Sequence, residues 1–257
     1  MTTQLEELQI LLKKTPSHPN WRKVCELIDR WPQATLGEAI SAIDAQAARW
    51  DVDTNKHGVW EMPARYTPQA WAKRLLAGDV PQGFSVARLF QQHNAKLQDA
   101  GLARLLGTGA FGSITHLYLG ICSLGAGALA LIADHQSQLG ALTHLVLSYN
   151  QLAPEGLAAL LATPLARRLV SLDLSQTPLD ARALDALLAT PLPALRYLDL
   201  SFIELSGKQM AAIVHADTLP QITTLRVPTT DAQSPNEALR ARGVGHPHLL
   251  AALRDSH

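Results

Sequence analysis

The residues whose types could support chemistry come in pairs with nearly the same spacing. His116 and His144 are 28 residues apart, and Asp173 and Asp199 are 26 residues apart. Two histidines held side by side could bind a zinc ion, and two carboxylates about 5 Å apart could support retaining glycoside hydrolysis. Whether either pair can work depends on the elements that carry it.

The leucines follow the same spacing and define those elements. In the segment LTHLVLSYNQL, Leu142 to Leu152, every fixed position of the pattern L-x-x-L-x-L-x-x-N/C-x-L is matched. A weaker first copy starts at Leu89. The second leucine of the pattern recurs at Leu117, Leu145, Leu172, Leu198 and Leu225, at intervals of 28, 27, 26 and 27 residues. We therefore expect about six repeats.

Each repeat is expected to form a short strand, a turn and a helix. The strand leucines, such as Leu145 and Leu147, are two residues apart and therefore face the same core. Leu157, Leu160 and Leu161 have the i, i+3, i+4 spacing of one buried helical face. A single repeat cannot bury both sets, so neighbouring repeats must stack on one another.

A slot directly after each strand is expected to hold a side chain that hydrogen-bonds the backbone of the bend. Ile203 cannot form such a bond, which predicts a locally different bend in its repeat. The residues in this slot are Asn94, Cys122, Asn150, Thr177, Ile203 and Thr230.

This pattern resembles the ribonuclease-inhibitor-like class of the leucine-rich repeat family, over about residues 84–232. The linkers LATPLARRL and LATPLPAL look like those of bacterial repeat arrays. The resemblance implies an α/β fold, a right-handed leucine-rich repeat solenoid with a parallel sheet on its concave side and helices on its convex side. It also implies that another protein binds to the concave face.

The two ends of the chain depart from the repeat. Residues 1–83 contain all five tryptophans, and their apolar residues follow helical spacing, so we expect an α-helical N-terminal capping domain. Residues 84–232 form the repeats. Residues 233–257 begin near a helix-start signal, Ser-Pro-Asn-Glu, and are expected to form a C-terminal helical cap.

The composition is balanced in charge along the whole chain. Lys and Arg equal Asp and Glu at 22 each, with 10 against 10 in residues 1–83 and 12 against 12 in the rest. Nucleic acid and membrane surfaces are therefore not expected as partners, because binding them needs a basic excess. Two cysteines, no basic leader and no run of about 18 apolar residues indicate a soluble cytoplasmic protein.

Neither pair of chemical residues is expected to form a catalytic or metal site. In the predicted strands, the column of the two histidines continues as Arg88 and Ser171, which leaves zinc without a third ligand. We interpret the histidines as partner contacts or as a solvated pair. Each aspartate lies in an L-D-L-S strand, where this residue type commonly faces solvent, and it could equally contact a basic partner.

Two further candidate sites are incomplete. Residues 51–55 copy the first three ligand positions of a calcium loop, but Lys56 and Met62 stand where a glycine and a bidentate glutamate are required. We interpret this segment as a connecting loop. Cys25 lies on an apolar helical face and is predicted to be buried and inert. No catalytic residue, cofactor or metal ion is therefore expected.

Aromatic side chains are expected to be the main contacts on the concave face. Phe90, Tyr118 and Tyr197 fall at outward strand positions, and Tyr149 and Phe202 fall where strands end. Aromatics exposed together on a rigid surface often anchor interfaces. Alternatively, they shield the strand edges of their own repeats. The residues expected to orient the partner are His116, His144, Asp173, Asp199 and Arg226.

The leading hypothesis is a non-enzymatic protein-binding module, an adaptor or an enzyme inhibitor of the immunity type, that binds another protein on its concave face. The alternative is an effector whose N-terminal helices carry an activity and whose repeats select the substrate. No catalytic constellation is visible in residues 1–83, which favours the first hypothesis. No motif specifies the partner or an oligomeric state.

Overall fold

The computed structural model of this 257-residue chain describes residues 3–15, 17–46, 70–92 and 95–227. The expected C-terminal cap, the segment 51–55 and the slot residues Asn94 and Thr230 lie outside the described residues. The N-terminal helices are α1 (Gln4–Lys13), α2 (His18–Asp29), the 3-10 helix η1 (Gln33–Thr35) and α3 (Leu36–Asp44).

The repeat array contains a row of helices. Its α-helices are α5 (Ala70–Leu76), α6 (Gln98–Gly107), α7 (Ala128–Asp134), α8 (Pro154–Leu161), α9 (Pro164–Arg168), α10 (Ala181–Ala189) and α11 (Gly207–Val214). The 3-10 helices η3 (Gln82–Val86) and η4 (Ala110–Ser113) precede the first two strands.

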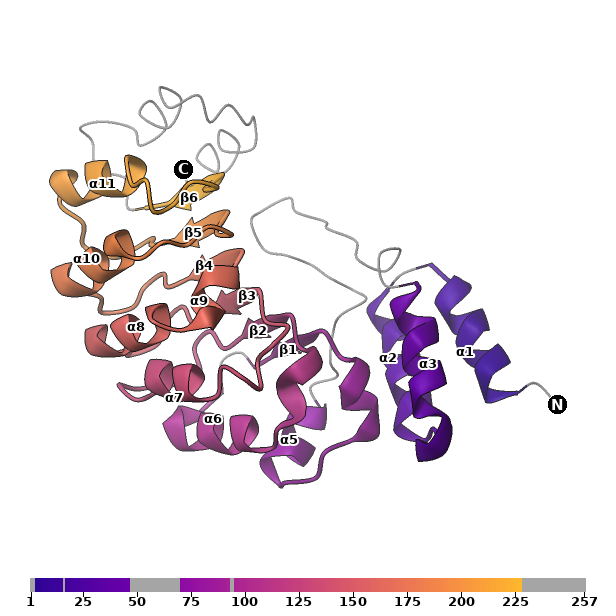
Figure 1. Cartoon of the computed structure of the whole chain (residues 1–257). Coiled ribbons are helices and arrows are strands. Elements are labelled where there is room, and N and C mark those ends of the chain that lie inside the picture. Colours follow the sequence, from indigo (N-terminus) through magenta and orange to yellow (C-terminus); the bar gives the residue numbers. More distant parts are fainter. Residues whose placement is uncertain (1–2, 16, 47–69, 93–94, 228–257) are drawn as a thin grey trace.

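Six short strands form one parallel sheet, in the order in which they occur along the chain. They are β1 (Leu89–Gln91), β2 (His116–Tyr118), β3 (His144–Val146), β4 (Ser171–Asp173), β5 (Tyr197–Asp199) and β6 (Thr224–Arg226). Parallel neighbours need a connection that crosses back, and the helices make this return on one side of the sheet (Figure 1). The predicted α/β leucine-rich repeat solenoid is confirmed.

The register of the strands places the repeat leucines in one buried column. The leucines that pair across β2 to β5 are at most 1% exposed, and they are Leu117, Leu145, Leu172 and Leu198. Leu147, two residues further on, is buried as well because alternate strand residues face the same side. Leu157 and Leu160 of α8 bury the helical side of the same layer. The core therefore runs continuously between sheet and helices.

The first strand has a register different from the one expected. The residue that pairs with Leu117 is Phe90, whereas Leu89 pairs with His116. A shift by one residue exchanges the two faces of a strand, so Phe90 points into the core and is 1% exposed. The prediction that Phe90 is a contact on the concave face is therefore wrong. The column of the histidines continues as Leu89 and not as Arg88.

Three aromatic rings account for this register. Phe90 packs edge to face against Phe84 and Phe111, with ring centroids 6.1 and 5.1 Å apart, and those two rings are 5.4 Å from each other. Burying a ring removes more apolar surface from water than burying a leucine, and edge-to-face contacts add to that gain. The start of the array is thus sealed by phenylalanines rather than by the leucine of the pattern.

Asn150 joins two repeats in the bend that follows β3. Its side chain is buried, and Oδ1 accepts hydrogen bonds from the backbone N–H groups of Cys122 and Leu124, both at 3.0 Å. Nδ2 donates to the carbonyl oxygens of Leu119 and Leu147 at 2.8 and 2.9 Å. The amide therefore satisfies buried backbone groups of its own repeat and of the preceding one.

The remaining slots make fewer bonds. Thr177 Oγ1 donates to the carbonyl oxygen of Leu174 at 2.6 Å, within its own repeat. Ile203 is 2% exposed and contributes packing. The bend before Ile203 nevertheless keeps a left-handed residue, Phe202 with φ of 61°, as the other repeats do. The predicted local difference is thus absent from the backbone at this position.

The N-terminal helices contact the array through α2 and η3. Gln82 Nε2 donates to the carbonyl oxygens of Ile28 and Trp31 at 2.9 and 2.6 Å, and so satisfies the C-terminal end of α2. Asp29, in the same turn, pairs with Arg74 of α5 at 2.9 Å. Helix α5 already lies beside α6 in the row of helices (Figure 1). The row therefore starts before the first strand.

Replacing Asn150 by alanine should lower the free energy of unfolding by roughly 2–4 kcal/mol, because buried N–H and carbonyl groups in two repeats lose their partners. Thr177→Val is a matched control in the same slot. It removes one hydroxyl bond and should cost only about 1 kcal/mol. Urea denaturation measures both values, and equal losses would show that the slot residue packs rather than bonds.

We propose that residues 1–83 act as a cap, and deleting them tests this role. The deletion removes α2 from η3 and α5 from α6, and so exposes apolar surface of the first repeats. The shortened protein should aggregate or unfold without cooperativity, as measured by size-exclusion chromatography and urea denaturation. A soluble fragment with one sharp transition would contradict the capping role.

Candidate protein-binding surface

The outward face of the sheet carries two columns of side chains, one on each side of the buried leucine column. The first column is Leu89, His116, His144, Ser171, Tyr197 and Thr224. The second column is Gln91, Tyr118, Val146, Asp173, Asp199 and Arg226. The structure thus brings seven of the predicted contact residues onto one face.

His116 and His144 stack face to face in the first column. Their ring centroids are 3.8 Å apart and their planes are inclined by 14°. The hydroxyls of Thr115 and Thr143 lie 2.8 Å from the Nδ1 atoms of His116 and His144 respectively, which fixes the orientation of both rings. His116 is fully buried and His144 is 9% exposed. The pair is therefore withdrawn from solvent and offers little surface to a partner.

Asp199 is the centre of a buried polar cluster on β5. Its Oδ2 accepts a hydrogen bond from the Tyr197 hydroxyl at 2.9 Å and lies 3.7 Å from Arg226 Nη1, and its Oδ1 accepts from the Ser201 N–H at 2.9 Å. Burial first, and then the Asp199 carboxylate, raise the pKa of Tyr197, so its hydroxyl stays protonated and donates. Asp199 and Tyr197 are 4% and 8% exposed, and both are held by this cluster.

Asp173 lies beside this cluster on β4 and is half-buried. Its Oδ1 accepts hydrogen bonds from the backbone N–H and the hydroxyl of Ser175, at 2.9 and 2.7 Å. Burial raises the pKa of the Asp173 carboxyl above its ordinary value, the Ser175 hydroxyl opposes this, and the nearby Asp199 raises it further. The ionised form of Asp173 is thus less stable here than in water.

The residues that precede the slots form a strand-exit rim along the sheet. They are Ile121, Tyr149, Gln176 and Phe202, and their φ angles lie between 52° and 61°. This left-handed conformation costs a residue with a Cβ atom about 1 kcal/mol or more and is usually occupied by glycine or asparagine. Tyr149 and Phe202 are nevertheless 47% and 74% exposed. These two aromatic side chains point outward at a cost in backbone energy.

The structure therefore sorts the predicted contact residues by accessibility. Tyr149 and Phe202 are exposed, whereas Tyr118, Asp173 and Arg226 are half-buried. The buried ones are Phe90, His116, His144, Tyr197 and Asp199. Sequence reasoning placed the two exposed aromatics correctly at the strand ends but missed their left-handed backbone. The position four residues after the marker leucine would have been the signal for it.

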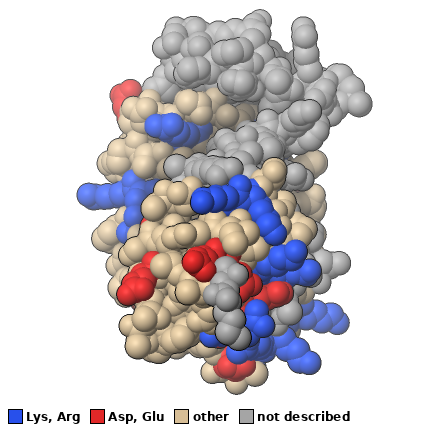
Figure 2. Space-filling view, turned by 90° about the vertical axis from the view of Figure 1, so that its right-hand side faces the viewer, with Lys and Arg blue, Asp and Glu red and all other residues tan. Residues whose placement is uncertain are grey.

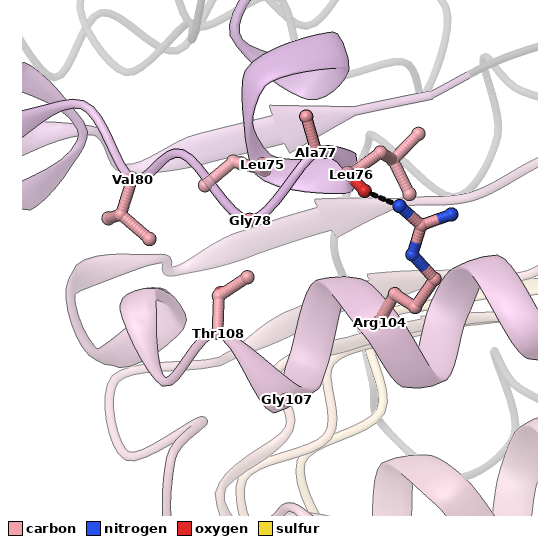
Figure 3. Close-up of a pocket in the computed structure, with 8 residues that line it drawn as sticks. All are labelled: Leu75, Leu76, Ala77, Gly78, Val80, Arg104, Gly107 and Thr108. Atoms are coloured by element: carbon pink, nitrogen blue, oxygen red, sulfur yellow. Dashed lines mark hydrogen bonds between the residues drawn. The ribbon is translucent and has the colours of Figure 1, made fainter.

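A separate open cavity of about 500 Å³ lies between the end of α5 and α6 (Figure 3). Its lining is mainly apolar, and Arg104 supplies the charged group. The Arg104 guanidinium donates to the carbonyl oxygen of Leu76 and so caps the end of α5. We interpret this cavity as the joint between two neighbouring helices of the row.

The two thiols are poor nucleophiles. Burial raises the pKa of Cys25 far above its ordinary value and raises that of Cys122 to about 11. Cys122 Sγ also donates to the carbonyl oxygen of Gln92 at 3.2 Å. Within the described ranges, no group of three histidine, cysteine, aspartate or glutamate side chains has the arrangement of a metal site.

The surface charge of the described residues is mixed. Figure 2 shows acidic and basic side chains interspersed on the side that it presents, without a broad patch of one sign. None of the helices in the described part of the chain is long and apolar enough to span a bilayer.

Comparisons with known proteins bear on the repeat itself. A family model described as Leucine Rich repeat matches residues 142–161, which contain β3, the Asn150 bend and α8. Among solved structures, the chain is similar to an internalin from Listeria monocytogenes, with 20% sequence identity and a TM-score of 0.36. That alignment covers 55% of this chain and 42% of the internalin chain, so this chain spans less than half of its length. A search of curated proteins finds no match.

The matched repeat segment has the strand, the buried asparagine and the helix that the period predicts for each copy. The same unit recurs along one parallel sheet of six strands. These observations together identify the chain as a member of the leucine-rich repeat family.

Proposed function

We propose that this protein is a non-enzymatic binding module, an adaptor or an inhibitor of another protein, and that its partner docks on the strand-exit rim and the adjoining column of the concave face. Leucine-rich repeat proteins generally mediate protein–protein interactions through an extended rigid surface. The observation that carries the proposal is the exposure of Tyr149 and Phe202, at 47% and 74%, on one edge of such a surface.

The backbone at these two residues supports a functional reason for their exposure. An exposed tyrosine or phenylalanine in a left-handed conformation stabilises the fold less than asparagine or glycine would. Outliers of this kind collect at binding sites because the surrounding structure holds them in place. The rim also lies on rigid repeats, so little conformational entropy is lost when a partner binds.

The proposed surface includes half-buried residues of the second column. Tyr118 packs against His116, with ring centroids 6.2 Å apart, and Val146 and Asp173 follow it on the next two strands. These side chains offer an aromatic, an aliphatic and a charged group in succession. The buried histidines support this surface from the first column.

The alternative, an enzymatic N-terminal segment, gains no support from the residue best suited to it. Cys25 is fully buried in α2, and its raised pKa keeps the thiol protonated. Both cysteines are free and buried, which agrees with the cytoplasmic location that we propose.

Tyr149→Asn and Phe202→Asn separate binding from folding. Each should weaken the complex by on the order of 2 kcal/mol, mainly through faster dissociation, because an aromatic anchor is lost. The free energy of unfolding should stay unchanged or rise by up to about 1 kcal/mol, because asparagine tolerates the left-handed conformation. Biolayer interferometry with a partner captured from cytosol and urea denaturation give the two values.

Arg182→Ala in α10 and Lys208→Ala in α11 are the controls on the convex side, where both side chains are exposed. They should leave the affinity unchanged. If affinity responds to these two residues and is indifferent to Tyr149 and Phe202, the partner docks on the helices and the proposed surface is wrong.

A further inference from the structure

Tyr149 and Phe202 stand on either side of Asp173 along the direction of the sheet. Tyr149 follows β3, Asp173 belongs to β4, and Phe202 follows β5. Adjacent strands lie about 4.8 Å apart, so the two aromatic residues start roughly 10 Å from each other with the repeat of Asp173 between them. Gln176, exposed on the rim, lies in this intervening repeat.

The carboxylate of Asp173 has binding capacity left. Ser175 donates two hydrogen bonds to Oδ1, whereas Oδ2 receives none from the residues that the structure describes. The side chain is partly accessible, in contrast to the buried Asp199 on the next strand. An ionised carboxylate can accept about four hydrogen bonds, so a donor from outside can be accommodated at Oδ2.

The charges around Asp173 are unbalanced. The charged side chains on the neighbouring strands are Asp199 on β5 and Arg226 on β6, and Arg226 pairs with Asp199 at 3.7 Å. Glu204, exposed just beyond Phe202, adds a further negative charge at the rim. On β3 the outward residues are Val146 and the neutral or protonated His144 in the buried stack. Three carboxylates therefore face one arginine.

Partial burial makes this excess negative charge costly. The raised pKa of Asp173 has burial as its largest cause and the repulsion of Asp199 as a further one. An incoming cation would relieve that repulsion in a medium less polar than water, where charge pairs are stronger. The same charges disfavour the phosphates of nucleic acid and the acidic surface of a membrane.

We infer that the protein partner presents an arginine or lysine side chain that binds Asp173 at Oδ2, with its aliphatic stem between Tyr149 and Phe202. This inference rests on the proposed function and specifies the chemistry of the partner. A cation midway between two aromatic residues roughly 10 Å apart lies within about 6 Å of each, the range of cation–π attraction. The Gln176 amide supplies a further acceptor for the planar donor group of arginine.

A peptide selection on the full-length protein tests this inference with peptides in place of the natural partner. A random 12-residue peptide library displayed on phage is selected against the immobilised protein, and enriched peptides are synthesised for affinity measurements. Enriched sequences should contain arginine or lysine flanked by apolar residues. Their affinity should fall about tenfold on Asp173→Asn and should weaken as salt is raised, because the lost interaction is ionic.

Asp185→Asn is the matched control, because it removes the same charge from the exposed side of α10. It should leave the affinity of the peptides unchanged. Asp173→Asn keeps an oxygen that can accept from Ser175, and the raised pKa shows that the ionised carboxylate destabilises the native state at neutral pH. Its free energy of unfolding at pH 7 should therefore equal or exceed that of the wild type.

The outcomes separate this inference from the proposed function. Peptides that lack basic residues, or that bind Asp173→Asn as well as wild type while Phe202→Asn abolishes their binding, overturn the cation and leave the rim as the binding surface. Peptides unaffected by Tyr149→Asn and Phe202→Asn overturn the rim itself. A selection that yields no peptide dependent on Asp173 also counts against the inference.

Discussion

No repeat of this protein can bury its own apolar residues, and the rest of the structure depends on that constraint. The strand leucines and the helical leucines of one unit are covered only when the next unit stacks against them. Asn150 extends the same dependence to polar groups, since it bonds the backbone of two successive repeats. Stability is therefore transmitted from neighbour to neighbour, and the first repeat needs both its phenylalanine cluster and the contact of η3 with α2.

Stacking also aligns equivalent residues into continuous rows. The turn after each strand repeats one left-handed residue, so whatever side chain stands there joins an exposed rim. In two repeats that side chain is a large aromatic, Tyr149 or Phe202, where the backbone alone would favour glycine or asparagine. A geometric requirement of the bend thus becomes a means of presenting apolar groups at fixed spacing to a partner.

The concave face is divided into a supporting part and an accessible part. The stacked histidines and the cluster of Tyr197 with Asp199 are buried and hold one another in place. Asp173 and Tyr118 remain partly accessible beside them. Buried polar groups that are hydrogen-bonded make a surface rigid, which lowers the entropy lost on binding. We propose that the accessible part and the rim together form the docking surface.

The sequence by itself determined the repeat period, the buried leucine column and the position of Asn150, because each of these follows from local spacing that recurs in every copy. It also placed Tyr149 and Phe202 at the strand ends. Tertiary structure alone decided that Phe90 turns inward, since the choice depends on Phe84 and on Phe111 of the next repeat. It also decided that Asp99 binds the N–H groups of Gly125 and Gly127, at 2.7 and 2.9 Å, across 26 and 28 residues. The burial of His116 and Tyr197 belongs to the same class, because solvent access depends on what lies against a side chain in space and not on its position in a repeat.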